Sequence, residues 1–136
     1  MRRKFGKLLN ELAKQDDKIV LLVGDIGYGI FDDFRRTHPK KFFNLGICEQ
    51  SLLGAASGMS LEGLKPWVYT ITPFLIERPF EQLKLDINQQ NVNTTMMRNR
   101  HKKKKSQQRY GGCNGPRVQY TFVDNDDLRV SPVSPL

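Results

Sequence analysis

The 136-residue chain is poor in the residue types that build metal centres and disulfide frameworks, with only two His and two Cys. Cys48 and Cys113 are isolated, and no Cys-x-x-Cys pair occurs, so neither a zinc site nor a disulfide framework is predicted. No run of about 18 apolar residues is present, which argues against a membrane-spanning helix. The basic start is not followed by an apolar core and a cleavage site, so we expect no signal peptide and a cytoplasmic location.

Several common catalytic and nucleotide-binding motifs are also missing. The glycines at residues 24–29 are not in the order of a dinucleotide fingerprint, and no Lys-Ser or Lys-Thr pair follows them as in a phosphate-binding loop. No serine stands in the frame of a nucleophile elbow. The sequence therefore predicts neither a nucleotide-binding loop nor a serine nucleophile of these types.

The net charge of +8 is unevenly distributed along the chain. Residues 1–93 hold 13 basic and 11 acidic residues, a net charge of +2, whereas residues 94–136 hold 9 and 3, a net charge of +6. The apolar content falls at the same place, from 40 of 93 residues to 12 of 43. We therefore predict one domain over residues 1–93 and a basic, irregular tail of no recognised family over residues 94–136.

The predicted tail leaves several interpretations open. Its dense basic run at residues 98–109 could bind nucleic-acid phosphates non-specifically, but no nucleic-acid motif accompanies it, and such runs are usually solvated. The alternating residues 118–123 predict one strand. The abrupt change of pattern is also typical of a truncated or frameshifted reading frame, which sequencing of the coding DNA would test.

Helical and strand patterns alternate along residues 1–93. Apolar residues at three- and four-residue steps predict helices, and short unbroken apolar runs predict strands buried on both faces. The predicted helices are 2–15, 31–37, 49–61 and 76–90, the last regular from Arg78 with Phe80, Leu83, Lys84 and Ile87 on its inner face. The predicted strands are 19–23, 42–45 and 66–71, and a fourth opens at 91–93. This order predicts an α/β fold with an open parallel sheet and helices on both faces.

In open parallel sheets, ligands bind beyond the carboxyl ends of the strands. The loops expected at that rim are residues 24–30, 46–50 and 70–78. Glu49 stands where a strand ends and an apolar helix begins. Taken alone, it is either an acidic residue favoured by the helix dipole or a buried functional carboxyl group.

Three motifs accompany the three predicted strands in order: Gly-Asp-Ile-Gly at 24–27 ends the first, Phe-Phe-Asn-Leu-Gly-Ile-Cys-Glu-Gln at 42–50 contains the second, and Phe-Leu-Ile-Glu-Arg-Pro-Phe-Glu-Gln at 74–82 follows the third. Their order and spacing resemble the pyrimidine-binding domain of the transketolase family of thiamine-diphosphate enzymes. The resemblance runs from about Phe5 to Asn93 and is strongest to the C-terminal subunit of split transketolases. The 1-deoxyxylulose-5-phosphate synthase and pyruvate dehydrogenase beta-subunit branches are more distant options.

The resemblance implies a catalytic role for Glu49. In the family, the matching carboxyl group binds the aminopyrimidine ring and drives the tautomerisation that lets thiamine diphosphate react as a carbanion. Such a Glu works best partly buried, because desolvation opposes its ionised form and allows proton sharing. The neighbouring Ile47, Leu52 and Leu53 are expected to supply that apolar setting.

Four further residues match cofactor-binding positions of the family. Phe74 is expected to stack on the pyrimidine ring, or else to pack in the core. Ile47 is expected to make an apolar contact to the cofactor. Asp25 and Arg78 match positions near the cofactor, although Asp25 could equally cap a turn and Arg78 could equally form a solvated ion pair.

In this family a second domain holds the diphosphate through Mg²⁺ with a Gly-Asp-Gly motif, which this chain does not contain. The resemblance therefore implies an enzyme only in a complex, as a homo- or hetero-oligomer with a diphosphate-binding domain or subunit. The implied activity is that of a transketolase-type transferase, which moves a two-carbon ketol unit between sugar phosphates. The alternative is a catalytically degenerate fragment or regulatory subunit.

Overall fold

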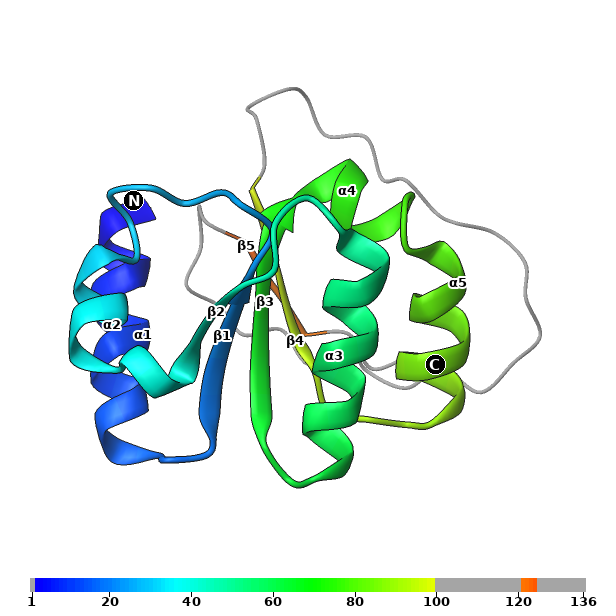
Figure 1. Ribbon diagram of the computed structural model, residues 1–136, viewed down its shortest axis with the longest axis horizontal. Coiled ribbons are helices and arrows are strands. Elements are labelled where there is room, and N and C mark those ends of the chain that lie inside the picture. Colours follow the sequence, from blue (N-terminus) through cyan, green and yellow to red (C-terminus); the bar gives the residue numbers. More distant parts are fainter. Residues whose placement is uncertain (1, 100–120, 125–136) are drawn as a thin grey trace.

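The computed structural model describes residues 2–99 and 121–124, in which five parallel strands are flanked by helices (Figure 1). The first half of the chain forms α1 (Arg2–Gln15), β1 (Ile19–Val23), α2 (Asp32–Thr37), a 3₁₀ turn (Pro39–Lys41) and β2 (Phe42–Asn44). The second half forms α3 (Glu49–Leu61), β3 (Lys65–Ile71), α4 (Thr72–Ile76), α5 (Phe80–Gln82), a π-helix (Leu83–Gln89), β4 (Thr95–Asn99) and β5 (Thr121–Asp124). The predicted α/β class with a parallel sheet is confirmed.

The strands lie in the order β2-β1-β3-β4-β5. From β1 the chain first moves to one side of the sheet to form β2, and then crosses to the other side to form β3. The carboxyl ends of β1 and β3 therefore flank a topological switch point, which is where open α/β sheets bind ligands. In Figure 1 this edge of the sheet is at the top, with the loop after β1, the loop before α3, and helix α4.

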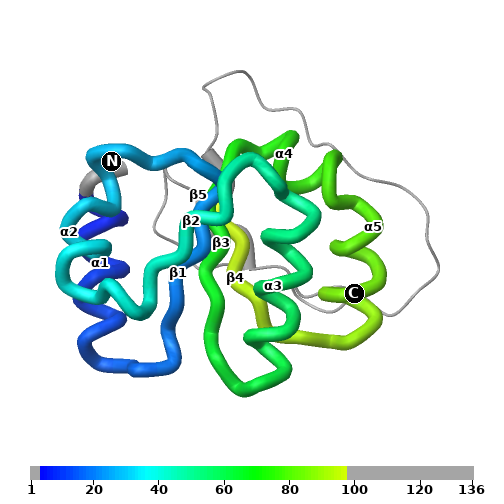
Figure 2. Tube along the Cα trace, viewed as in Figure 1, coloured from blue at the N-terminus to red at the C-terminus, as the bar shows by residue number. Residues whose placement is uncertain are grey.

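Strand β1 explains why helices cover both faces of the sheet. Its residues Ile19, Leu21 and Val23 pack into one apolar cluster with α1 and α2, and Val20 and Leu22 pack into a second cluster with α3 and the π-helix. Side chains alternate between the two faces of a strand, so an unbroken apolar run is buried on both sides. Figure 2 shows α1 and α2 on one side of the strands and α3 and α5 on the other.

The helix predicted over residues 76–90 differs from the structure. Helix α4 begins at Thr72 and ends at Ile76, Arg78 lies in the connection, and helical structure resumes at Phe80. Pro79 has no backbone N–H and interrupts the run, so the prediction of a regular helix from Arg78 is wrong. Leu83 and Ile87 are buried as expected. Phe80 and Lys84 are exposed, so the inner face is narrower than predicted.

The fourth strand begins later than predicted. A turn at Gln90 and Asn91, with Asn91 in a left-handed conformation, follows the π-helix, and β4 starts at Thr95. Met96 and Met97 of β4 are fully buried, so the sheet continues past residue 93. Strand β5 coincides with part of the strand predicted over residues 118–123. Most of the basic run at 98–109 lies outside the described residues.

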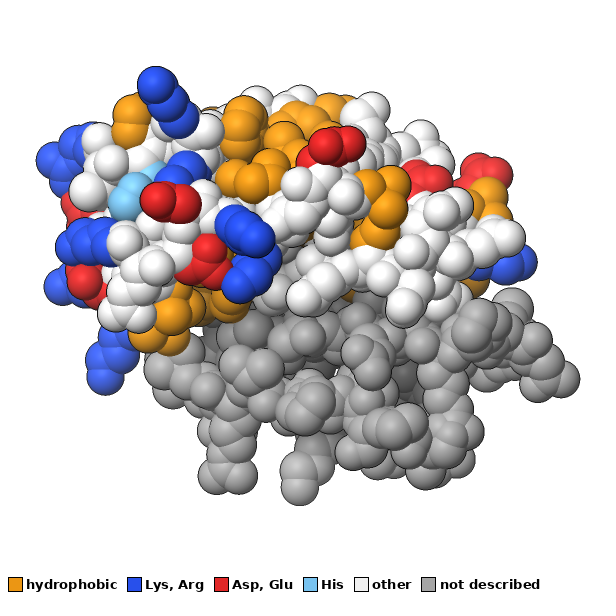
Figure 3. All heavy atoms as spheres, turned by 90° about the horizontal axis from the view of Figure 1, so that it is seen from below, with side chains coloured by type: hydrophobic (Ala, Val, Ile, Leu, Met, Phe, Trp, Pro, Cys, Tyr) orange, Lys and Arg blue, Asp and Glu red, His pale blue; other side chains and the backbone are white. Residues whose placement is uncertain are grey.

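The amino end of the sheet carries ordinary ion pairs. Acidic and basic side chains are interspersed over the side formed by α1 and α2, and hydrophobic side chains gather nearer the middle (Figure 3). Lys65 Nζ lies 2.6 Å from an Asp16 oxygen, and Lys41 Nζ lies 2.9 Å from an Asp17 oxygen. Exposed pairs of this kind contribute little to stability.

Among the described residues, 2–99 and 121–124, none of the helices combines the length and the apolar character that a membrane span requires.

Candidate functional site

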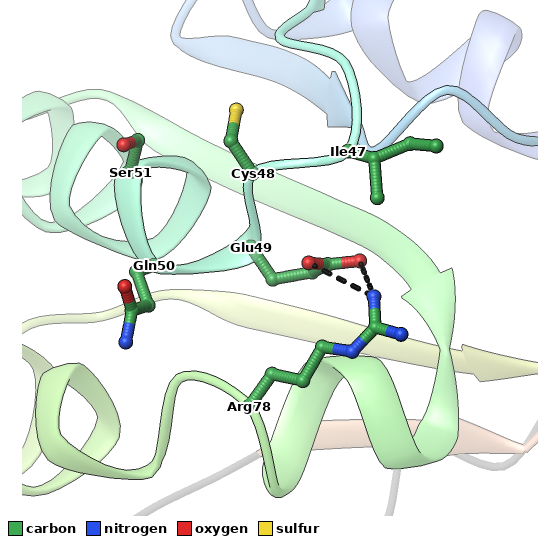
Figure 4. A pocket seen from close by; sticks show the side chains of 6 residues that line it. All are labelled: Ile47, Cys48, Glu49, Gln50, Ser51 and Arg78. Atoms are coloured by element: carbon green, nitrogen blue, oxygen red, sulfur yellow. Dashed lines mark hydrogen bonds and ion pairs between the residues drawn. The ribbon is translucent and has the colours of Figure 1, made fainter.

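Glu49 is the first residue of α3, at the carboxyl edge of the sheet, and only 5% of its surface is exposed. The N-terminus of a helix favours negative charge, because its free N–H groups carry a partial positive charge. A buried carboxylate also needs a partner, because desolvation is otherwise costly. Arg78 provides one: its Nη1 donates to both Glu49 oxygens, at 3.2 and 3.4 Å (Figure 4).

Arg78 also stacks on an aromatic ring. It follows Phe74 by about one helical turn, and its Cζ lies 3.5 Å from the centroid of the Phe74 ring. A guanidinium group over an aromatic face is held by a cation–π interaction. Phe74 is half-buried on α4, and the Arg78 side chain is 48% exposed. Arg78 thus links Glu49, from the start of α3, to Phe74, from the helix that follows β3.

Glu49 and Arg78 border an open hollow of about 480 Å³. The side chains that line it are Ile47, Cys48, Glu49, Gln50, Ser51 and Arg78 (Figure 4). Ile47 is 73% exposed, so the expectation that it shields Glu49 is wrong. It lies in the connection between β2 and α3. Leu52 and Leu53, one turn into the helix, are fully buried as expected.

A second polar group joins the loops that follow β1 and β2. The Asp25 carboxylate accepts hydrogen bonds from the Tyr28 hydroxyl at 2.7 Å and from Asn44 Nδ2 at 3.1 Å. Asn44 Oδ1 in turn accepts from the backbone N–H groups of Asp25 and Gly46, both at 3.0 Å. The bond from Tyr28, and then that from Asn44, lowers the pKa of Asp25, and the Asp25 carboxylate raises the pKa of Tyr28.

The structure joins three of the five predicted site residues, because Arg78 contacts both Glu49 and Phe74. Ile47 lines the same hollow, whereas Asp25 belongs to the separate polar group. Sequence reasoning missed Asn44, whose amide connects the two loops. The available signal was its position: a short amide side chain at the end of a predicted rim strand, two residues before a glycine.

Metal-binding side chains do not gather in this region. Within residues 2–99 and 121–124, no group of three or more His, Cys, Asp or Glu side chains is placed to hold a metal ion. Glu49, Arg78 and Phe74 instead bring together one carboxylate, one guanidinium group and one aromatic ring.

Comparison with known proteins identifies relatives of this fold and site. A family model described as the transketolase pyrimidine binding domain matches residues 1–103. An uncharacterized transketolase family protein of Sinorhizobium fredii, y4mN, is 40% identical over 84 residues, which are 61% of this chain and 24% of that protein. The 1-deoxy-D-xylulose-5-phosphate synthase of Clostridium perfringens is 39% identical over 93 residues, which are 68% of this chain and 15% of that protein.

A solved structure is similar in both fold and sequence. It is a split-gene transketolase, described as an inactive beta4 tetramer, with a TM-score of 0.64 and 36% sequence identity. The match covers 69% of this chain and 32% of that chain. The chain therefore spans less than a third of the length of each of these proteins.

Proposed function

The chain belongs to the transketolase pyrimidine-binding domain family, and from this we propose that it supplies the aminopyrimidine-binding half of a thiamine-diphosphate site. The observation that carries the proposal is the buried Glu49 carboxylate at the switch point of the sheet, linked through Arg78 to the Phe74 ring. When bound, thiamine diphosphate supplies a carbanion that attacks a carbonyl carbon.

The residues of the site fit an aminopyrimidine ring. Glu49 presents two acceptor oxygens, and Phe74 presents a ring face that accepts a flat, nitrogen-rich group, the Arg78 guanidinium. An aminopyrimidine is likewise flat and carries nitrogen atoms at its edge. We assign to Glu49 the hydrogen bond to the ring nitrogen, through which its carboxyl group shares a proton, and to Phe74 the stacking contact.

The other predicted site residues take supporting roles in this proposal. Ile47, exposed at the edge of the hollow, offers an apolar contact to a bound ring. Asp25 helps to hold the rim loops through its bonds to Tyr28 and Asn44. Arg78 contacts both Glu49 and Phe74.

The diphosphate and its Mg²⁺ are proposed to bind a partner domain or subunit, because this chain contains no Gly-Asp-Gly motif. The likeness to a split-gene transketolase supports such an arrangement. In the assembled oligomer, the reaction would be transfer of a two-carbon ketol unit between sugar phosphates in the cytoplasm. The second candidate is a non-catalytic subunit that keeps the fold and the partner surface, and the absence of Gly-Asp-Gly also favours it.

Calorimetry tests the proposal. Thiamine diphosphate with Mg²⁺ is titrated into the full chain alone and then into a mixture with a diphosphate-binding subunit of the split-transketolase type. We expect thiamine diphosphate to bind only in the mixture. We also expect Glu49→Gln to lower the ketol-transfer turnover of the mixture by about 10²- to 10⁴-fold, because the variant loses a group that moves a proton. Glu81→Gln, at an exposed position of α5, is the matched control and should change neither quantity.

Circular dichroism of both variants separates loss of the site from loss of the fold. A folded Glu49→Gln variant with unchanged affinity and turnover would remove the proposed role of Glu49. A wild-type mixture that assembles but binds no cofactor would favour the non-catalytic subunit instead.

A further inference from the structure

The Arg78 guanidinium lies where a stacked ring would have to lie. Its Cζ is 3.5 Å from the centroid of the Phe74 ring. At this distance the guanidinium group is in van der Waals contact with the ring. Its Nη1 also donates to both oxygens of Glu49. Two flat groups cannot occupy the same face of one ring at this distance. A ring that stacked on this face of Phe74 and bonded to Glu49 would therefore overlap Arg78.

We propose that Arg78 is a stand-in for the aminopyrimidine, which holds the Glu49 carboxylate in place in the free chain and is displaced when the cofactor ring enters. This inference rests on the proposed function. It makes Arg78 a positioning residue that acts through Glu49, rather than a permanent cofactor ligand.

The chemistry of the two groups explains how one replaces the other. A guanidinium group is planar, donates N–H bonds to a carboxylate and stacks on aromatic faces, whereas the ammonium group of Lys is a compact point charge. An aminopyrimidine shares the plane and the nitrogen-bearing edge. Arg78 is therefore matched to Glu49 and Phe74 by shape as well as by charge.

Burial indicates which partner moves. Glu49 is nearly inaccessible at the start of α3, whereas about half of the Arg78 side chain already faces solvent. Arg78 also lies in the connection between α4 and α5, outside either helix. Its side chain can therefore turn outwards without disturbing a helix, while the Glu49 carboxylate, which would be costly to leave unpaired, exchanges one donor for another.

Arg78 in this position should weaken the apparent affinity for the cofactor. When only a fraction of the molecules is open to a ligand, the apparent affinity falls by that fraction. If Arg78 fills the site in about nine-tenths of the free molecules, the apparent affinity is about tenfold weaker than that of an open site. Removing the guanidinium should then strengthen cofactor binding, although it removes a cation from the site.

Nuclear magnetic resonance of the full chain tests the closed state without any cofactor. A guanidinium held by Glu49 and Phe74 rotates slowly, so the wild type should show a restrained arginine Nη signal that disappears in Arg78→Ala and in Glu49→Gln. Arg36→Ala is the matched control, because Arg36 pairs with Asp33 on the exposed surface of α2. Absence of a restrained Arg78 signal in the folded wild type would overturn the inference and leave the proposed function intact.

Calorimetry on the assembled complex tests the displacement. Arg78→Ala should bind thiamine diphosphate up to about tenfold more tightly than the wild type. Arg78→Lys, which keeps the charge but cannot stack as a plane, should show a smaller gain, and Arg36→Ala no change. Equal or weaker binding by folded Arg78→Ala and Arg78→Lys variants would identify Arg78 as an ordinary cofactor contact. If the wild-type complex binds no cofactor, the proposed function fails, and the magnetic resonance result alone decides whether Arg78 fills the site.

Discussion

Asp25 lies directly after Gly24 at the end of β1, in a left-handed backbone conformation with φ of 52°. Short polar residues tolerate this conformation because their side chains can bond locally. Here the carboxylate is held by Tyr28 and Asn44, which lower its pKa. Its stabilising effect is therefore present above the ordinary value of 3.8 and is lost as the pH falls through the lowered pKa of the folded state.

We expect Tyr28→Phe to raise the pKa of Asp25 towards 3.8, and by more than Asn44→Ala does, because the bond from Tyr28 is the larger cause of the shift. The measurement is a carboxyl-carbon magnetic resonance titration of the full chain. Asp16, whose pKa is lowered chiefly by a bond from Lys65, is the internal control and should not change. An Asp25 that titrates alike in wild type and Tyr28→Phe would show that this bond does not form in solution.

At the scale of elements, the connection from β2 to α3 decides where Glu49 lies. Asn44 closes β2, Gly46 takes a φ of 79°, and the Cys48 N–H donates to the Gly46 carbonyl at 3.0 Å. The Cys48 carbonyl then accepts the first bond of α3, from Leu52 at 2.9 Å. The turn at Gly46 therefore positions the start of the helix that carries Glu49.

Two glycines with equal free space allow a test of this connection. A Cβ added at Gly46 or at Gly58 would meet nothing within 4 Å, so any difference comes from the backbone. Gly46→Ala should lower the free energy of unfolding by about 1–2 kcal/mol, because its left-handed conformation is strained for Ala. Gly58→Ala, inside α3, should raise it by about 0.5–1 kcal/mol. Urea denaturation measures both, and equal signs would contradict the described turn.

At the scale of the whole molecule, β4 joins the two halves of the core. Met97 packs in the cluster with α1 and α2, whereas Met96 packs in the cluster with α3 and the π-helix. The strand pairs with β3 over its full length, from Thr95 to Asn99. The stability of residues 1–93 therefore depends on side chains that follow them in the sequence.

We expect Met97→Ala to lower the free energy of unfolding by about 2–5 kcal/mol, because it leaves a cavity in a fully buried position. This loss is a large part of the total of about 5–15 kcal/mol that is usual for a domain. Leu8→Ala, at a position of α1 that is 41% exposed, is the control and should cost about 1 kcal/mol or less. Similar losses for the two variants in urea denaturation would mean that β4 does not pack as described.

Features that depend only on neighbouring residues can be predicted from the amino-acid sequence. The unbroken apolar run at 19–23 predicts β1, because a strand buried on both faces has apolar residues at every position. The helical pattern at 49–61 predicts α3, because a helix buried on one face has apolar residues at three- and four-residue steps. The alternation of such elements predicted the parallel sheet and its carboxyl edge, where Glu49 was expected. Pro79 indicates a constraint on the start of the helix, but the sequence pattern does not predict the separate helix α4 before it.

Contacts between side chains from distant segments are known only from the folded chain. Glu49 and Arg78 are 29 residues apart, and their contact depends on how the connections after β2 and β3 are placed by the sheet. The same long-range placement left Ile47 exposed and drew Met96 and Met97 into the core. No local periodicity encodes these contacts, because each depends on the packing of segments that are distant in the sequence. The pairing that keeps Arg78 on the face of Phe74 is therefore a property of the folded molecule.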